Sequence, residues 1–307
     1  MQVHIPVLLD KILEYFDPKP GQRFIDATVD GGGHALAILE KITPGGKLLG
    51  IEWDGELVKH LKLQVEHSEL KDGVILINDS YVNLKEIAEQ NDFIGADGIL
   101  FDLGLSSWHL ESAGRGFSFQ KEEPLDMRFA GAYADSQLPV SNGGLTAGQI
   151  VNDYSYDELV KILKEYGEER FAKSISAGIT KARKEKPVKS TFDLIEIIKN
   201  SVPFWYRRGR RHFATRTFQA LRIAVNNELG NIEVGLDRAL EVLKVGGCLA
   251  VITFHSLEDR VVKNFLRSKA AMGTVKIMTK KPVMPSLAEI TANPRARSAK
   301  LRAAVKI

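Results

Sequence analysis

Short apolar runs alternate with amphipathic segments along the first hundred residues of the chain. The apolar runs at 23–28, 47–51, 74–78 and 98–103 have the length of buried strands. The segments between them repeat apolar residues at three- and four-residue steps, which is typical of helices. Strands that alternate with helices predict a parallel sheet covered on both faces.

This alternation stops near residue 104. The next 45 or so residues are rich in glycine, serine and proline and lack periodicity, so we expect a long, partly ordered connection. Helical patterns return from about 157 to 200 without an obvious strand. The pattern predicts a small helical domain over residues 111–212, inserted into a sheet domain formed by residues 1–110 and 213–307.

The sheet pattern resumes after residue 217. Apolar residues recur at helical spacing from Phe218 to Leu243, which predicts one long helix that Gly246-Gly247 ends. Cys248–Phe254 is then expected to form a fifth buried strand, and residues 275–278 and 300–305 a closing antiparallel hairpin.

Composition excludes several classes of protein. With 44% hydrophobic and 26% charged residues among 307, the chain is globular, not disordered, fibrous or membrane-like. Its one cysteine, Cys248, rules out an internal disulfide and is expected to be a buried structural residue. The first ten residues do not resemble a signal peptide and no stretch approaches ~18 apolar residues, so we expect a cytoplasmic protein.

A glycine-rich turn, Gly31-Gly32-Gly33, lies where the first strand should pass into a helix. Glycines allow a ligand to approach the backbone, and a helix N-terminus offers free N–H groups. The turn lacks the G-x-G-x-x-G pattern of nicotinamide enzymes, and Asp26 and Asp30 would repel a pyrophosphate. Acidic residues beside glycines instead suit a ligand with a cationic end, such as S-adenosylmethionine; a plain turn is the alternative.

Polar residues also end the following strands. Glu52 ends the second, about 20 residues after the glycines, where a carboxylate can accept hydrogen bonds from ribose hydroxyls; an exposed loop carboxylate is the alternative. Tyr81 follows the third strand, placed to pack on an adenine face, and Asp102 ends the fourth. Because ligands bind at the carboxyl ends of parallel strands, these residues are predicted to form one site.

Distinctive blocks of sequence occur nearly from one end of the chain to the other. They are HIPVLL (4–9), GGGH (31–34), DGILFDLGLSS (97–107), RGFSF (115–119), PLDMR (124–128), YGEER (166–170), ATRTFQALRI (214–223), FHSLEDR (254–260) and NPRARSAKLR (293–302). In this order they resemble the RsmH (MraW) family of 16S ribosomal RNA cytosine-N4 methyltransferases. The resemblance implies an α/β fold, a class I (Rossmann-like) methyltransferase sheet with an inserted small helical domain. It also implies methylation of a cytidine in the small ribosomal subunit.

The same resemblance implies which residues contact the cofactor, S-adenosyl-L-methionine. They are Gly32, Gly33, His34, Glu52, Tyr81, Asp102 and His109. Three positions depart from the family's usual pattern, which more often has Asp at Glu52, Gln at His109 and Pro at Phe213. Glu52 keeps the carboxylate with a longer reach, so ribose binding is expected to survive.

Three residues are candidates for catalysis. The amine of cytosine is a poor nucleophile, because its lone pair is delocalised into the ring. Asp102 is expected to orient that amine or relay its proton, with cofactor binding alone as the alternative. His255 and Ser256 follow the fifth strand and are expected to position the base, with a helix-capping role as the alternative.

Residues 204–213 interleave arginines with aromatic residues, which suits contacts to phosphates and stacking on bases; a solvated basic loop is the alternative. The predicted RNA-binding residues are Arg207, Arg208, Arg210, Arg211, Arg216, Arg295 and Arg297. The expected partner is 16S rRNA in the small ribosomal subunit. We expect neither membrane binding nor a metal site, and the sequence leaves open whether the protein forms a homodimer. The two rival functions are a nicotinamide-dependent oxidoreductase and a ribosome assembly factor without catalysis.

Overall fold

The computed structural model describes residues 6–130 and 144–307. The first five residues, and residues 131–143 of the predicted connection, lie outside the described residues. The chain divides into a sheet unit, formed by Met1–Gly104 and Leu229–Ile307, and a helical unit, Leu105–Glu228. The predicted domain boundaries, after residues 110 and 212, therefore differ from those of the structure. The second differs most, because helix α11 (Thr215–Asn226) packs on α6 (Ala147–Asp153) and α7 (Tyr156–Glu165) of the helical unit.

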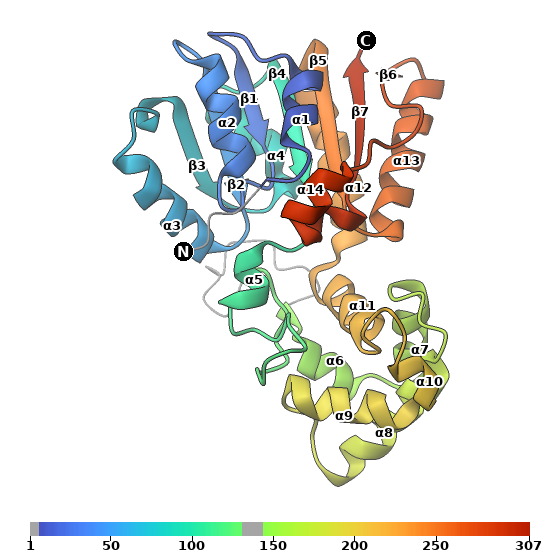
Figure 1. The fold of residues 1–307 in the computed structure, drawn as a ribbon. Coiled ribbons are helices and arrows are strands. Elements are labelled where there is room, and N and C mark those ends of the chain that lie inside the picture. Colours follow the sequence, from blue (N-terminus) through green and yellow to red (C-terminus); the bar gives the residue numbers. More distant parts are fainter. Residues whose placement is uncertain (1–5, 131–143) are drawn as a thin grey trace. The chain divides into compact units, whose positions relative to one another are not determined.

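Seven strands form one sheet in the order β3-β2-β1-β4-β5-β7-β6 (Figure 1). Strands β1 to β5 run parallel, and β7 runs antiparallel to both of its neighbours. Their bounds are β1 Arg23–Asp26, β2 Lys47–Glu52, β3 Val74–Asn78, β4 Ala96–Asp102, β5 Leu243–Thr253, β6 Val275–Ile277 and β7 Lys300–Lys306. The predicted Rossmann-like sheet, its helical insertion and the closing β6–β7 pair are confirmed. The strand order reverses between β1 and β4, and ligands bind at such a switch point in open α/β sheets.

Two apolar cores cover the two faces of this sheet, because successive side chains of a strand point to opposite faces. Ile25, Leu49 and Ile99 face one core, and the residues beside them, such as Phe24 and Leu48, face the other. The first core is closed by α4 (Leu84–Gln90), α12 (Glu228–Val242) and α13 (Ser256–Ala271). The second is closed by α1 (Leu9–Phe16), α2 (Gly33–Ile42) and α3 (Gly55–Glu66).

The single long helix predicted from Phe218 to Leu243 is wrong. Asn227 has a left-handed backbone (φ 48°), which ends α11 and separates it from α12. Asparagine tolerates this conformation and the apolar spacing continues past it, so the pattern did not show the break. Strand β5 begins at Leu243, and Gly246 (φ 82°) lies within it instead of capping a helix.

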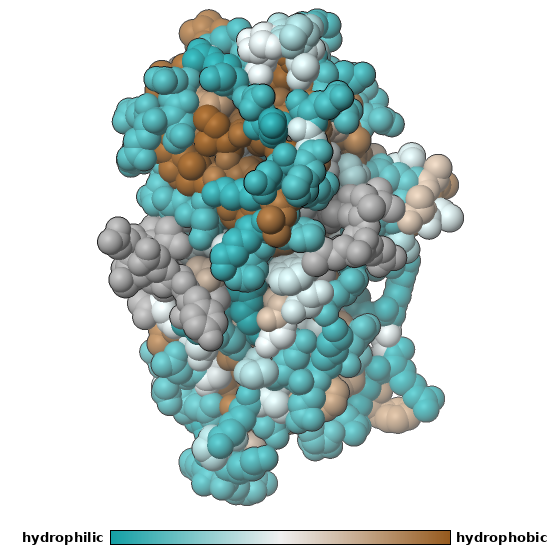
Figure 2. Space-filling model, turned by 90° about the vertical axis from the view of Figure 1, so that its left-hand side faces the viewer, coloured by the Kyte–Doolittle hydropathy of each residue, from teal (hydrophilic) through white to brown (hydrophobic). Residues whose placement is uncertain are grey.

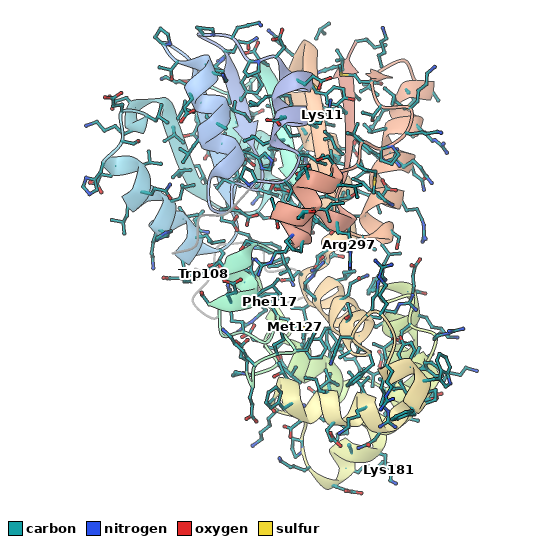
Figure 3. All side chains as sticks on the ribbon, viewed as in Figure 1. Lys11, Trp108, Phe117, Met127, Lys181 and Arg297 are labelled. Atoms are coloured by element: carbon teal, nitrogen blue, oxygen red, sulfur yellow. The ribbon has the colours of Figure 1, made fainter. Side chains whose placement is uncertain are left out.

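The helical unit has its own apolar core, to which Phe117 and Met127 belong (Figure 3). Its helices are α5 (Ser107–Glu111), α6, α7, α8 (Ala172–Glu185), α9 (Thr191–Ser201), α10 (Phe204–Arg207) and α11. Helices α6, α7 and α9 begin with capping boxes, in which Thr146, Ser155 and Ser190 accept a backbone N–H. The helical unit thus has the features of a separately packed domain.

Strand β3 is one edge of the sheet, and its Ile75 and Ile77 are half-buried. Figure 2 looks at the side of Figure 1 on which β3 lies, and there it shows apolar side chains gathered on the sheet unit.

No helix among the described residues is long and apolar enough to cross a membrane.

Candidate active site

Four carboxyl groups gather where β1, β2 and β4 end, on both sides of the switch point: Asp26, Asp30, Glu52 and Asp102. Asp26, Glu52 and Asp102 are buried and Asp30 is half-buried. Burial raises the pKa of Asp26 to about 7 and that of Glu52 to about 7. Burial, followed by repulsion from neighbouring carboxylates, holds the pKa of Asp30 and of Asp102 well above the usual range. Such strongly shifted groups in one cluster mark a candidate functional site.

The glycine turn between β1 and α2 needs its glycine at Gly32. This residue has a left-handed backbone (φ 80°), and a Cβ there would lie 2.6 Å from Leu61 Cδ1. Glu52 ties the turn to the end of β2, because its carboxylate accepts the backbone N–H of Asp30 (3.1 Å) and of Asp54 (2.8 Å). The predicted ribose-binding carboxylate therefore also has a structural role in the turn that it would offer to a ligand.

His34 and Asp102 form a buried pair. His34 Nε2 lies 2.9 Å from the carbonyl oxygen of Val7, and Nδ1 lies 3.4 Å from Asp102 Oδ2. A carbonyl only accepts hydrogen bonds, so Nε2 carries a hydrogen and Nδ1 faces the carboxyl. A proton between Nδ1 and Oδ2 would join the two groups, either as imidazolium and carboxylate or as imidazole and carboxylic acid.

The other oxygen of Asp102 is the carboxylate oxygen of the cluster that stands apart. Among the described residues, Asp102 Oδ1 is buried and has no hydrogen-bond partner. The backbone N–H of Asp102 donates to Thr28 Oγ1 at 2.6 Å, which holds the residue in place. A buried polar atom without a partner is rare in folded proteins, and at the end of a strand it marks a place for a ligand donor.

Tyr81 follows β3 and packs edge-on against Phe101, with ring centroids 5.5 Å apart. Its ring also lies against Gly235 of α12, where a Cβ would come within 2.6 Å of Tyr81 Cδ2. Gly235 therefore sets the position of the Tyr81 ring, a role that the sequence analysis missed. A glycine inside an amphipathic helix was the available signal.

Three further predicted residues are engaged in local structure. His109 belongs to the helical unit, where its Nδ1 lies 2.9 Å from Ser106 Oγ and its ring packs against Phe117. His255 caps α13, since the backbone N–H of Glu258 donates to its Nδ1 at 3.3 Å. Ser256 is the first residue of α13 and is exposed. The capping role is present for His255, and the catalytic role of both residues stays a prediction.

The predicted RNA-binding arginines fall into two groups on different units. Arg208, Arg210 and Arg211 follow or end α10 in the helical unit and are exposed. Arg207 and Arg216 of that unit are half-buried and donate to the carbonyls of Val202 and Glu168. The remaining two, Arg295 and Arg297, are exposed in a 3-10 turn, Pro294–Ser298, beside α14 (Leu287–Ala292); Figure 3 labels Arg297.

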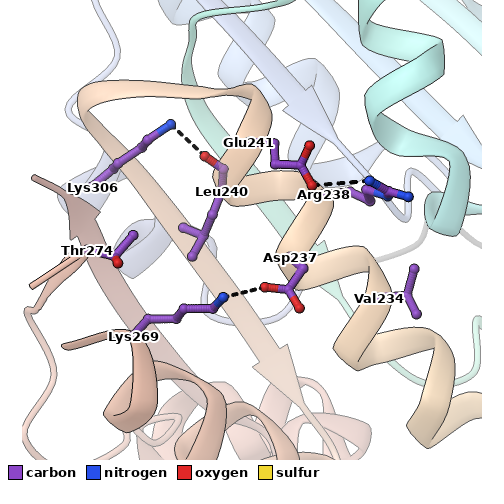
Figure 4. Close-up of a pocket in the computed structure, with 8 residues that line it drawn as sticks. All are labelled: Val234, Asp237, Arg238, Leu240, Glu241, Lys269, Thr274 and Lys306. Carbon is purple, nitrogen blue, oxygen red and sulfur yellow. Dashed lines mark hydrogen bonds and ion pairs between the residues drawn. The ribbon is translucent and has the colours of Figure 1, made fainter. Parts of the chain in front are cut away.

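A hollow of about 630 Å³ also lies on the sheet unit, beside α12 (Figure 4). Its charges neutralise one another: Lys269 pairs with Asp237 at 2.5 Å and Arg238 with Glu241 at 3.1 Å. Lys306 donates to the carbonyl of Leu240, near the C-terminal end of the helix, at 2.6 Å. These groups satisfy one another and, unlike the carboxyl cluster, call for no ligand.

Comparison with known proteins identifies the family of the chain. The model of the MraW methylase family matches residues 1–307. A protein of Heliobacterium mobile is 43% identical over 99% of both chains, and one of Persephonella marina is 43% identical over 100% of both. Each is named Ribosomal RNA small subunit methyltransferase H. The chain therefore belongs to the MraW methylase family.

Proposed function

We propose that the protein transfers a methyl group from S-adenosyl-L-methionine to N4 of a cytidine in the 16S rRNA of the small ribosomal subunit, in the cytoplasm. The observation that carries the proposal is the carboxyl cluster at the switch point, with the unpaired Oδ1 of Asp102 in it. The names of the relatives support the small subunit as substrate. The choice of cytosine N4 is supported by the sequence blocks that resemble the family.

The cluster fits a cationic cofactor. Among the described residues, no lysine or arginine forms an ion pair with Asp26, Asp30, Glu52 or Asp102. A ligand that carries a sulfonium and an ammonium would supply the missing positive charge, since an opposite charge nearby favours the ionised carboxylate. We assign Glu52 to the ribose hydroxyls. Tyr81 is assigned to the adenine.

The chemistry needs alignment and removal of one proton. The cofactor supplies an electrophilic methyl group when it is bound. The amine nitrogen forms a bond to the methyl carbon as the carbon–sulfur bond breaks, and the nitrogen then loses a proton. Asp102 Oδ1 accepts a hydrogen bond from the amine and takes that proton, while His34 on Oδ2 stabilises the carboxylate beforehand. His34 thus acts as a positioning residue. We assign His255 and Ser256 to holding the cytosine base in position.

Replacement of Gly235 by alanine tests the Tyr81 assignment. The new methyl group should displace the Tyr81 ring, and we expect a roughly tenfold loss of affinity for S-adenosylmethionine, about 1.4 kcal/mol. Alanine favours a helix over glycine by about 1 kcal/mol, which offsets part of the overpacking. Isothermal titration calorimetry gives the affinity. V234A, at an exposed position on the same helix, is the control and should bind like the parent; equal losses in both variants would argue against the assignment.

The affinity for S-adenosylmethionine should rise with pH through about 7, because Asp26 and Glu52 ionise there. The stability of the free protein should change the other way. Both pKa values are raised above 3.8 and 4.5, so the neutral forms stabilise the fold, and this contribution is lost as pH rises through about 7. Calorimetry and thermal melts between about pH 5 and 8 measure both trends. S-adenosylhomocysteine lacks the sulfonium charge and should show a flatter profile; parallel profiles for the two ligands would contradict the prediction.

The proposed reaction itself is tested with small subunits from cells that lack this gene. They are incubated with the protein and methyl-labelled S-adenosylmethionine, and the digested RNA is examined by mass spectrometry. N4-methylcytidine at one site is the expected product. Cofactor binding without incorporation would favour the assembly factor instead, and absence of cofactor binding would refute the proposal.

A further inference from the structure

Two large aromatic side chains stand exposed next to each other on α10. Phe204 is 60% exposed and Trp205 is 59% exposed. Single exposed apolar residues are common, but an adjacent pair on a four-residue helix concentrates apolar surface at one point. The surrounding structure holds this helix firmly, so the exposure is not that of a loose loop.

The third aromatic residue of α10 anchors the helix. Tyr206 Oη donates to Glu169 Oε2 at 2.8 Å, and Glu169 is only 2% exposed. Burial and this hydrogen bond raise the pKa of Tyr206 to about 12, so the phenol stays a donor at neutral pH. The ring of Phe171 packs edge-on against both Tyr206 (4.8 Å) and Trp205 (5.7 Å). The inner side of α10 is therefore held in place. The exposed rings of Phe204 and Trp205 lie on a helix that needs no ordering before a ligand binds.

Guanidinium groups lie over both exposed rings. The Cζ atom of Arg208 lies 4.4 Å from the centroid of Phe204, and that of Arg170 lies 5.7 Å from Trp205. Both rings remain more than half exposed with these arginines in place. The eight residues 204–211 contain four arginines and no acidic residue. This surface thus combines two exposed aromatic rings with a cluster of positive charges.

We propose that Phe204 and Trp205 form a stacking platform for unpaired bases of an RNA strand, with Arg170 and Arg208 supporting the rings and Arg210 and Arg211 on the phosphates. Every base offers a π-face to an aromatic ring, so such a platform tolerates different sequences. A base-paired helix hides the faces of its bases, and an acidic protein has no bases. An unpaired strand offers exposed base faces together with phosphates. The proposal rests on the function proposed above and deepens it, because it names unpaired nucleotides of the substrate as the recognised element.

The test compares F204A, W205A and the double variant with F192A. Phe192 is an aromatic residue of α9 in the same unit and is 44% exposed, and no arginine of the described ranges lies over its ring. Binding of a fluorescent unpaired RNA oligonucleotide and of the matching duplex is measured by anisotropy. Methylation of small subunits gives KM and kcat, and calorimetry gives the cofactor affinity.

We expect the double variant to lose at least about tenfold in affinity for the unpaired strand and to raise KM similarly. Its duplex affinity, kcat and cofactor affinity should stay as in the parent, W205F should retain most of the binding, and F192A should behave like the parent. Equal losses on strand and duplex, or an equal effect of F192A, would overturn the platform. So would normal oligonucleotide binding combined with weaker binding to subunits, which would indicate a protein partner. A parent protein that binds the strand but methylates nothing would instead count against the proposed function.

Discussion

Replacement of Asp102 by asparagine should lower the rate of methyl transfer by about 10²- to 10⁴-fold, the usual contribution of a positioned acid or base. Asparagine keeps the shape of the side chain but cannot take the proton that the amine loses. The D102N variant should fold as stably as the parent. Burial already disfavours the charged form of Asp102, and a neutral amide avoids the cost of burying a charge.

Single-turnover methylation of small subunits measures the effect, with the cofactor saturating so that binding does not limit the rate. D97N is the matched control. Asp97 lies on the same strand β4 but near its other end, where its carboxylate accepts the backbone N–H of Arg23 at 2.8 Å. We expect this variant to keep the parental rate. A near-parental rate for D102N would remove Asp102 from the chemistry and leave it a structural or cofactor-binding residue.

Conversion of Arg207, Arg208, Arg210 and Arg211 to glutamine should weaken binding to small subunits by about two orders of magnitude at low salt. Each phosphate contact to a single strand contributes about 0.7 to the slope of log affinity against log salt. Arg210 and Arg211 are the two residues placed on phosphates, so the loss of their two contacts would reduce that slope by about 1.4. Binding is measured by filter retention or anisotropy over a salt series.

The control removes the same charge elsewhere on the helical unit, by conversion of the exposed Lys173, Lys181, Lys184 and Lys186 to glutamine. Binding that depends only on net charge would weaken equally in both variants. An unchanged salt slope in the arginine variant would refute a phosphate-binding role for residues 207–211.

Much of the sheet was predictable because buried strands are continuous apolar runs. The bounds of β3 agree with the prediction, and β2 differs by one residue. Helices α5 and α10 escaped prediction because five and four residues are too few to show a helical period. The break between α11 and α12 depends on the backbone conformation of Asn227 alone. The spacing of hydrophobic residues gives no information about that conformation.

The site was predictable where topology alone decides. The positions of Glu52 and Asp102 at the ends of β2 and β4 were predictable, because the ends of parallel strands meet at one edge of the sheet. The pairing of His34 with Asp102 depends on tertiary packing that also brings Val7, 27 positions away, to the imidazole. Gly235 likewise acts through its contact with Tyr81, and a glycine inside a helix, the one local signal, does not reveal that partner.

The point at which the helical unit enters the chain has a consequence for evolution. Leu103 still donates its N–H to the carbonyl of Ile252 at 3.0 Å, so the pairing of β4 with β5 is complete before the chain leaves the sheet unit after Gly104. Residues 105–228 can therefore lengthen, shorten or be exchanged without shifting the register that places Asp102. A lineage that needs a new target can alter this segment and keep the carboxyl cluster at the switch point, so divergence of target preference should be concentrated in one continuous stretch of the gene.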